Sequence, residues 1–315
     1  MASPTSESDK VAVIFGGLGF IGRYTCRAFA EVGYRVTVID YTEPEADYPF
    51  PTVVAALDQP DLYVDQLRAA DVVVCLASSN LPATANTNLA IDIEKNVQST
   101  VALAELCAEH GVESFLFASS GGTVYGDGAS VDIREDTPSM PINGYGASKV
   151  AIENYLRVLA RMTSLRVRSL RISNPFGLGQ DPRRKQGFIA AAVNAALTGE
   201  ELSIWGDGSV VRDYIHVADV AQAFVAASDY DGGFTEFNVG SGSGLTLLEV
   251  LDETEQAFDT EIRVSFEPGR EFDVPANVLN IERSGSQLGW VPEVKMRDAL
   301  KEMAKDPSTI PNTYR

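Results

Sequence analysis

The stretch IFGGLGFIG, residues 14–22, places four glycines within seven residues directly after an apolar run. Two overlapping spacings are present, G-x-G-x-x-G from Gly17 and G-x-x-G-x-x-G from Gly16, and both include Gly19 and Gly22. Glycine permits a tight turn and lets a diphosphate approach main-chain N–H groups. Without a side chain, Gly22 also allows a helix and a strand to pack closely. The stretch therefore predicts a strand, a dinucleotide-binding loop and a helix.

The residues around this loop refine the expected ligand. The helix is predicted to begin near Phe20, so Phe20 and Ile21 lie at its positive end. Asp40 ends the next apolar run, close to the spacing expected of an acceptor for a ribose 2′-hydroxyl. A carboxylate there repels a 2′-phosphate, and Tyr41 brings no compensating cation, so the sequence favours NAD over NADP. Asp58, after the third run, is a candidate for the adenine edge; the alternative is a lone surface aspartate.

Short β-branched runs alternate with helical stretches through the first half of the chain. Continuous apolar character marks strands that are buried on both faces, and intervening helices imply right-handed crossovers and a parallel sheet. The sequence therefore predicts an α/β fold, a Rossmann-type doubly wound parallel sheet. The six predicted strands cover residues 11–15, 35–40, 52–57, 71–78, 114–120 and 166–173. Because ligands bind at the carboxyl ends of such strands, Leu76, Ala77 and Ser78 are expected to contact the cofactor.

The rhythm changes after Ser173, where Gly- and Pro-rich loops are mixed with predicted helices at 188–198 and 247–258. We expect an NAD-binding domain over residues 10–172 and a smaller C-terminal α/β lobe, which binds the substrate, over residues 173–315. The segment 214–238 either belongs to the second lobe or returns to the first.

Composition excludes several classes of function. With 315 residues and a formal net charge of −19, the chain is expected to repel nucleic acid and anionic membranes. No apolar run is long enough to span a bilayer, and the first ten residues lack a signal peptide's apolar core, so a cytoplasmic protein is expected. The two histidines, His110 and His216, provide poorly for a zinc site or a Ser/His/Asp hydrolase, and no metal is expected. Cys26, Cys75 and Cys107 are expected to be buried thiols.

The stretch YGASK carries the predicted chemistry. Tyr145 and Lys149 are four residues apart, so on a helix their side chains lie on one face. Adjacent positive charge favours a phenolate, the form of a phenol that accepts protons. About two dozen residues earlier, FASSGGTVYG ends a predicted strand, and Ser119, Ser120 and Thr123 offer hydroxyls there. One of these could complete a proton relay, or the serines could merely terminate the strand.

Together these stretches resemble the extended short-chain dehydrogenases/reductases of the NAD-dependent epimerase/dehydratase family, and are most similar to its UDP-glucose 4-epimerases. The likeness extends over nearly the whole chain. It rests on GGLGFIG, EKNV, SSGGTVYG, YGASK, RISNPFGLGQ, WGDGSVVRDYIHVADVA and PGREFDVPANVLNI.

The resemblance implies roles for further residues. Asn96 would position the cofactor or its loop, Asn174 would contact the sugar diphosphate, and Asp273 would meet a ribose hydroxyl. Arg212 and Arg270 would bind the phosphates, as guanidinium forks do in proteins. The alternatives are a surface Arg-Asp pair for Arg212 and an exposed turn residue for Arg270.

One position departs from the family pattern. Gly121 occupies the place where many epimerases carry the catalytic Ser or Thr. Ser120 is therefore our first choice for the catalytic hydroxyl and Thr123 the second. Dehydratases of the family usually carry Asp-Glu before VYG, whereas this chain has Gly122 and Thr123, so the usual acid/base pair for elimination of water is missing.

The sequence thus predicts an isomerase that interconverts a UDP-hexose at C4 with retained NAD. By resemblance, Asn277 occupies the position whose bulk gates N-acetylated sugars, and its small size leaves room for UDP-GlcNAc or UDP-GalNAc. Helices over residues 87–109 and 144–162 are the expected homodimer interface. The alternatives are a nucleotide-sugar dehydratase, reductase or decarboxylase of the same family, or an NAD-binding sensor without activity.

Overall fold

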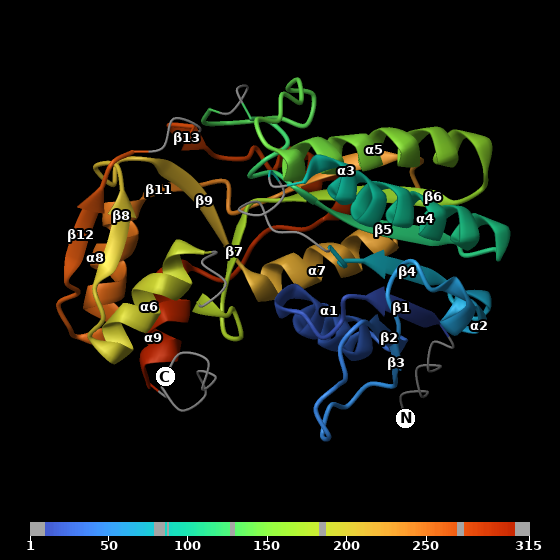
Figure 1. Ribbon diagram of the computed structural model, residues 1–315, viewed down its shortest axis with the longest axis horizontal. Coiled ribbons are helices and arrows are strands. Elements are labelled where there is room, and N and C mark those ends of the chain that lie inside the picture. The colour runs from blue at the N-terminus through green and yellow to red at the C-terminus, as the bar shows by residue number, and fades with distance from the viewer. Residues whose placement is uncertain are drawn as a thin grey trace, which may run out of the picture. The chain divides into compact units, whose positions relative to one another are not determined.

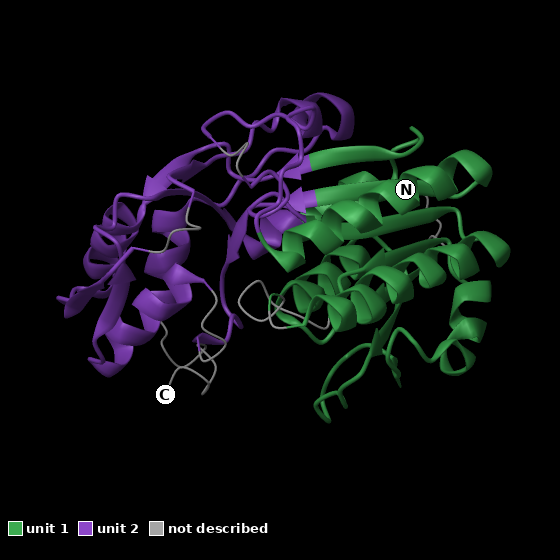
Figure 2. Ribbon diagram, turned by 45° about the horizontal axis from the view of Figure 1, so that its top comes forward, with its two compact units in different colours: residues 1–119, 143–170, 221–237 green, residues 120–142, 171–220, 238–315 purple. Residues whose placement is uncertain are grey.

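The computed structural model describes residues 10–78, 86, 88–126, 130–182, 187–269 and 274–305. The chain divides into two compact units that are interleaved along the sequence (Figure 2). Unit 1 contains residues 1–119, 143–170 and 221–237, and unit 2 contains residues 120–142, 171–220 and 238–315. Most of the segment 214–238 is thus assigned to unit 1, whereas residues 120–142 are assigned to unit 2.

A parallel sheet carries the first part of the fold, as the sequence predicted (Figure 1). Within the described residues it has seven strands in the order β10-β6-β5-β4-β1-β2-β3. The pairs β1–β2, β1–β4, β2–β3 and β4–β5 are parallel. The strands are β1 (Val11–Phe15), β2 (Arg35–Asp40), β3 (Thr52–Val54), β4 (Val72–Cys75), β5 (Ser114–Ser120), β6 (Arg166–Ile172) and β10 (Thr235–Val239).

Burial on both faces explains the continuous apolar runs. Every residue of β1 and β4 is buried, because helices cover both sides of a doubly wound sheet. On one face, β1, β4 and β5 share a hydrophobic core with α2 (Val64–Arg68), α4 (Ser99–Glu109) and α5 (Gly144–Met162). α4 and α5 pack against each other there (Figure 1). α1 (Phe20–Glu31) begins at the predicted residue and packs on β1 and β2.

Several strands differ from the sequence expectation. β4 covers Val72–Cys75 rather than residues 71–78, and β6 ends at Ile172 rather than at residue 173. β3 ends at Val54 rather than at residue 57, because β2 ends at Asp40, the partner of Val54, and leaves no further ladder to pair with. β10 is an edge strand that the sequence analysis did not recognise. Three of the five residues in its sequence, TEFNV, are polar, so the pattern is much weaker than the apolar runs of the inner strands.

The predicted helix over residues 87–109 is built from three consecutive pieces. α3 (Leu89–Asp92) begins at Asn88, whose side chain accepts a hydrogen bond from the amide of Ile91. A π-helical stretch, Ile93–Gln98, joins α3 to α4. Such stretches are rare and often occur at functional sites. A 3₁₀ turn, Pro60–Leu62, lies between β3 and α2.

Unit 2 is organised around β9 (Val211–His216). β9 pairs with β7 (Asn174–Phe176), β11 (Gly244–Thr246) and β13 (Ala276–Asn277), and β8 (Leu202–Trp205) pairs with β12 (Val264–Glu267). A separate core lies between β7, β9, α6 (Phe188–Thr198), α8 (Leu247–Phe258) and α9 (Met296–Lys305). α6 and α8 have the bounds that the sequence predicts. α8 begins with a capping box, in which the side chains of Thr246 and Glu249 each accept a hydrogen bond from the other's backbone amide.

The three cysteines are buried as expected, and His216 has a structural role at the start of a helix. All three thiols are free and buried, and burial raises the pKa of Cys75 to about 11. His216 Nδ1 accepts a hydrogen bond from the amide of Ala218 at 3.3 Å, at the start of α7 (Val217–Ser228). Burial lowers the pKa of His216, which favours the neutral ring needed for that acceptor role. Within the residues described, no helix is long and apolar enough to cross a membrane.

Candidate active site

Only glycine fits at two positions of the glycine loop, Gly16 and Gly22. Gly16 has φ +81°, and a Cβ there would lie 2.9 Å from the backbone nitrogen of Ala77. A Cβ on Gly22 would lie 2.2 Å from the Gly16 carbonyl oxygen, so the first turn of α1 packs directly on the loop. Gly19 precedes α1 without a side-chain cap, and the first N–H groups of a helix have no intrahelical partner. Phe20 and Ile21 supply two of these donors, so this cradle fits a diphosphate.

Asp40 and Tyr48 hold the loop in place. The Asp40 carboxylate is buried at the end of β2 and accepts hydrogen bonds from the Leu18 amide at 3.1 Å and from Thr42. The phenol of Tyr48 donates to the Gly17 carbonyl oxygen at 3.1 Å, a contact that no sequence pattern indicated. Burial raises the pKa of Tyr48 and so keeps it a donor. Asp40, which the sequence analysis assigned to a ribose hydroxyl, therefore also fixes the glycine loop.

Asp58 is not the lone surface aspartate that the alternative interpretation described. Its carboxylate forms an exposed ion pair with Lys95 at 2.8 Å, and this contact lowers the pKa of Asp58. Such exposed pairs contribute little stability.

Asn96 lies in a chain of polar contacts that connects three elements of unit 1. Its amide donates to Asp92 Oδ1 at 2.8 Å and its oxygen accepts from Ser78 Oγ at 3.4 Å. The buried Asp92 carboxylate also accepts a hydrogen bond from Ser148 on α5. The sequence analysis missed Asp92 and Ser148, although Asp92 and Asn96 have the i,i+4 spacing of helical neighbours. These hydrogen bonds fix the position of α5, the helix that contains Tyr145.

The structure places Tyr145 and Lys149 on one face of α5. The helix begins at Asn143, whose side chain accepts a hydrogen bond from the Gly146 amide at 2.8 Å. Lys149 Nζ lies 5.4 Å from the centroid of the Tyr145 ring and donates to the Ala118 carbonyl oxygen at 2.8 Å. Because Lys149 is 5% exposed, little water screens the ammonium. The positive charge is thus fixed beside the phenol, as a proton-transfer pair requires.

Gly121 has no room for a side chain. A Cβ there would lie 2.6 Å from Cδ1 of Leu279 and 2.9 Å from the Arg171 carbonyl oxygen. A Ser or Thr at position 121, which the resemblance led us to look for, is therefore excluded by packing, and the candidates remain the flanking residues. We call residues 120–123 the hydroxyl turn. Thr123 Oγ1 and, on β5, Ser119 Oγ are buried without a hydrogen-bond partner among the described residues.

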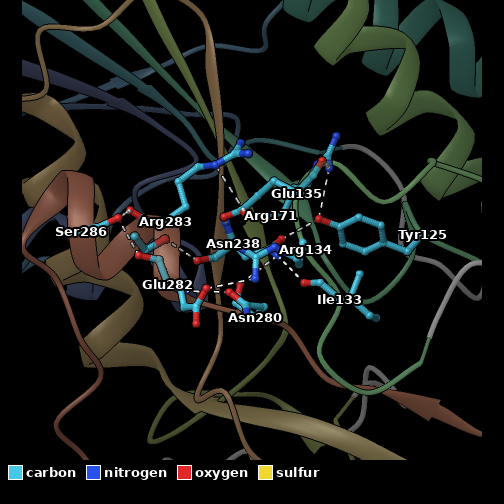
Figure 3. Close-up of polar contacts among 11 residues, drawn as sticks. Tyr125, Ile133, Arg134, Glu135, Arg171, Asn238, Asn280, Glu282, Arg283 and Ser286 are labelled. Carbon is cyan, nitrogen blue, oxygen red and sulfur yellow. Dashed lines mark hydrogen bonds and ion pairs between the residues drawn. The ribbon is translucent and has the colours of Figure 1, made fainter.

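A buried polar network fixes the chain directly after the hydroxyl turn (Figure 3). The Tyr125 phenol donates to Asn238 Oδ1 at 2.6 Å and accepts a hydrogen bond from Arg171 Nη1 at 3.1 Å. Arg171 Nη1 also donates to the Glu135 carbonyl oxygen, and Glu135 Oε1 accepts from the Asn238 amide. Arg283 lies 3.6 Å from the Glu135 carboxylate. All of these residues belong to unit 2, and the sequence analysis identified none of them.

Three of the predicted substrate residues lie on neighbouring strands of unit 2. Asn174 on β7 donates to the Asp213 carbonyl oxygen at 2.9 Å. On β9, Arg212 Nη1 donates to the carbonyl oxygens of Val211 and Val274, and Arg212 is in register with Asn277 on β13. Arg270 and Asp273 lie outside the described residues.

Asp213 rules out a surface Arg-Asp pair as the explanation of Arg212. It is 0% exposed and accepts hydrogen bonds from the amide and hydroxyl of Ser241, both at 2.7 Å, and from the Leu279 amide at 3.2 Å. Burial raises the pKa of Asp213 above its usual range in spite of these donors. Across the residues that the structure describes, no cluster of three or more His, Cys, Asp or Glu could hold a metal ion.

Known proteins are similar to this chain in sequence and in fold. The dTDP-4-dehydro-6-deoxyglucose reductase of Escherichia coli is 31% identical over 304 residues, covering 93% of this chain and 96% of the relative. The structure of Thermotoga maritima UDP-glucose 4-epimerase with UDP-glucose superposes with a TM-score of 0.88 at 29% identity, covering 93% and 97%. The Thermus thermophilus UDP-glucose 4-epimerase complex with NAD has a TM-score of 0.85 at 30% identity, covering 93% and 97%.

The family assignment rests on a match to a family model. The model of the NAD dependent epimerase/dehydratase family matches residues 12–240, which include the glycine loop, the hydroxyl turn, Tyr145 and Lys149. These are the motifs that the structure builds at the carboxyl ends of the strands and at the start of α5. The chain belongs to the NAD-dependent epimerase/dehydratase family.

Proposed function

We propose that the protein is an NAD-dependent nucleotide-sugar 4-epimerase that interconverts UDP-hexoses at C4. The observation that carries this proposal is the buried Lys149 ammonium, which lies 5.4 Å from the centroid of the Tyr145 ring on the same helix, α5. The UDP-glucose 4-epimerases of T. maritima and T. thermophilus, which match over almost their whole length, support the same assignment.

The cofactor site is assigned to unit 1. Gly16, Gly19 and Gly22 are proposed to form the loop against the diphosphate, and the N-terminus of α1 supplies the N–H groups of Phe20 and Ile21 and positive potential for it. Asp40 would accept the adenosine ribose hydroxyls and disfavour a 2′-phosphate. The other proposed cofactor contacts are Phe20, Ile21, Asp58, Leu76, Ala77, Ser78, Asn96 and Ser119. NAD, when bound, supplies a nicotinamide ring that accepts a hydride from the sugar carbon and returns it.

Proton transfer, unlike hydride transfer, is assigned to side chains of the protein. Tyr145 removes the proton of the C4 hydroxyl while the carbon is oxidised, and gives the proton back when the carbon is reduced from the opposite face. Lys149 stabilises the phenolate, because its ammonium is fixed nearby by the Ala118 carbonyl. The hydroxyl of Ser120, or alternatively of Thr123, is proposed to complete the proton relay. Each turnover leaves the proton count of the enzyme unchanged.

The nucleotide sugar is assigned to residues of unit 2. Arg212 is the guanidinium proposed to bind the diphosphate, together with Arg270, and Asn174 and Asp273 complete the polar contacts. In a chain with a net charge of −19, a dianionic ligand needs such a local positive group. Fixing the diphosphate would leave the hexose free to turn and present its other face.

One experiment tests the function as a whole. Denaturing the purified protein is expected to release NAD, and incubation with UDP-galactose is expected to give UDP-glucose, followed by NMR, without change of mass or net formation of NADH. Comparison with UDP-N-acetylgalactosamine measures the substrate range. Strict rejection of the acetylated sugar would exclude the expectation that a small residue 277 admits it.

A second candidate is a nucleotide-sugar reductase, which the likeness to the E. coli reductase favours. A reductase would consume NADH or NADPH in proportion to product and raise the product mass by two hydrogens, so the same NMR and cofactor assay separates the two functions. Bound NAD with no turnover of UDP-, dTDP-, GDP- or CDP-sugars would instead support a sensor.

We also place the protein in the cytoplasm as a homodimer. α5 carries an exposed apolar row, Tyr155, Val158 and Met162, the last of them 77% exposed. Residues at this spacing share one side of a helix, and such a row is typical of a subunit interface. Sedimentation equilibrium is expected to give twice the chain mass, and Val158→Glu with Met162→Glu is expected to give the monomer. A wild-type protein that sediments as a monomer would exclude this interface.

A further inference from the structure

The hydroxyl turn is held through its backbone. The Gly121 amide donates to the Ile172 carbonyl oxygen at 2.8 Å, and the amides of Thr123 and Val124 donate to the Ser120 carbonyl oxygen. The Gly121 carbonyl oxygen accepts a hydrogen bond from Asn277 Nδ2 at 3.1 Å. Of these four contacts, only the last comes from a side chain.

The turn needs such an external contact. Two consecutive glycines, Gly121 and Gly122, give it more conformational freedom than any other dipeptide would. Side-chain packing cannot restrain it at Gly122, where even an added Cβ would have no atom nearer than 3.9 Å. Ser120 and Thr123, which carry the candidate hydroxyls, flank this flexible pair. Their positions therefore depend on how well the Gly121 peptide is fixed.

The amide of Asn277 is retained at a cost. Asn277 is 1% exposed, and its Oδ1 is buried without a partner among the described residues. A carbonyl oxygen can only accept, so the amide must present its NH₂ group to Gly121 and leave Oδ1 on the other side. An apolar residue of similar size would avoid this unsatisfied oxygen. The donor function thus explains why an amide is present.

We propose that Asn277 is a positioning residue, which fixes the Gly121 peptide by its Nδ2 hydrogen bond and thereby places the hydroxyls of Ser120 and Thr123. This role rests on the proposed epimerase function and differs from that of a sugar-size gate. A gate acts through the volume of residue 277 and changes the preference between sugars. A positioning donor acts through one N–H group and changes the rate with every sugar.

Asn277→Leu separates these roles, because the side chain branches at the same carbon as Asn and has no hydrogen to donate. Asn277→Val is the second variant and also lacks the donor. Kinetics with UDP-galactose and UDP-N-acetylgalactosamine are expected to show kcat lowered about tenfold for each accepted sugar, with KM within about twofold. Asn194→Leu is the matched control. Asn194 lies on α6 and donates a hydrogen bond to the Glu200 carboxylate, so its replacement is expected to leave kcat unchanged.

Crystal structures of the wild type and Asn277→Leu provide a readout that does not depend on activity. The Gly121 carbonyl is expected to leave its wild-type position in the variant. An unmoved hydroxyl turn would overturn the proposal, as would wild-type kcat in either variant or a change confined to the preference between sugars. An inactive wild type would instead refute the proposed function, and the crystallographic comparison would still decide whether Asn277 holds the turn.

Discussion

Replacing Tyr145 by Phe is expected to lower kcat for UDP-galactose by about 10²- to 10⁴-fold, the contribution typical of a positioned acid or base. The substitution removes one oxygen and leaves the ring over which Lys149 lies. KM and bound NAD are expected to change little, because the phenol is assigned to proton transfer rather than to binding. Steady-state kinetics by NMR, with NAD content from the denatured protein, measure both quantities.

Tyr155→Phe is the matched control for this prediction. Tyr155 lies on the same helix, α5, and is 58% exposed. The same atom is removed from the same element, so kcat is expected to stay at the wild-type value. A Tyr145→Phe enzyme with full turnover would show that another group carries the proton. An equal loss in both variants would point to damage to α5.

The parts of the site that the sequence predicted are those in which a short local pattern is sufficient. The glycine loop lies between one strand and one helix, and Tyr145 and Lys149 lie one helical turn apart. In each case, neighbouring residues in the chain are neighbours in space, so spacing alone predicts geometry.

Contacts between distant segments could not be predicted in the same way. Tyr125 and Asn238 are 113 residues apart in the chain, yet their side chains meet (Figure 3). Asn277 and Gly121 are 156 residues apart. No local period connects such pairs. Glycine is required at position 121 because the side chain of Leu279, far along the chain, occupies the space that a larger residue would need.

Asp213 shows the same limit. In the sequence analysis, a surface pair with Arg212, its neighbour in the chain, was the alternative interpretation. Its acceptor role becomes visible only when Ser241 and Leu279 are brought to it by the fold. A residue whose partners come from distant segments cannot be told from a surface residue by its neighbours alone.

The second prediction with a large effect concerns Gly22→Ala in the glycine loop. Two physical rules predict opposite signs for its effect on the free energy of unfolding. Alanine favours helix interiors over glycine by about 1 kcal/mol, so propensity alone predicts that Gly22→Ala stabilises α1. Packing predicts the reverse, because the new Cβ would lie 2.2 Å from the Gly16 carbonyl oxygen and 2.6 Å from the Gly17 Cα atom. Both are backbone atoms, which cannot move aside without displacing the loop.

Packing is expected to decide the outcome, since overpacking of this kind costs about 1–3 kcal/mol. Gly22→Ala is therefore expected to lower the free energy of unfolding in urea and to reduce affinity for NAD at least about tenfold, which is about 1.4 kcal/mol. Gly233→Ala is the matched control, because a Cβ there would meet nothing within 4 Å. A Gly22→Ala protein as stable as the wild type and still loaded with NAD would mean that α1 does not need to approach the loop this closely.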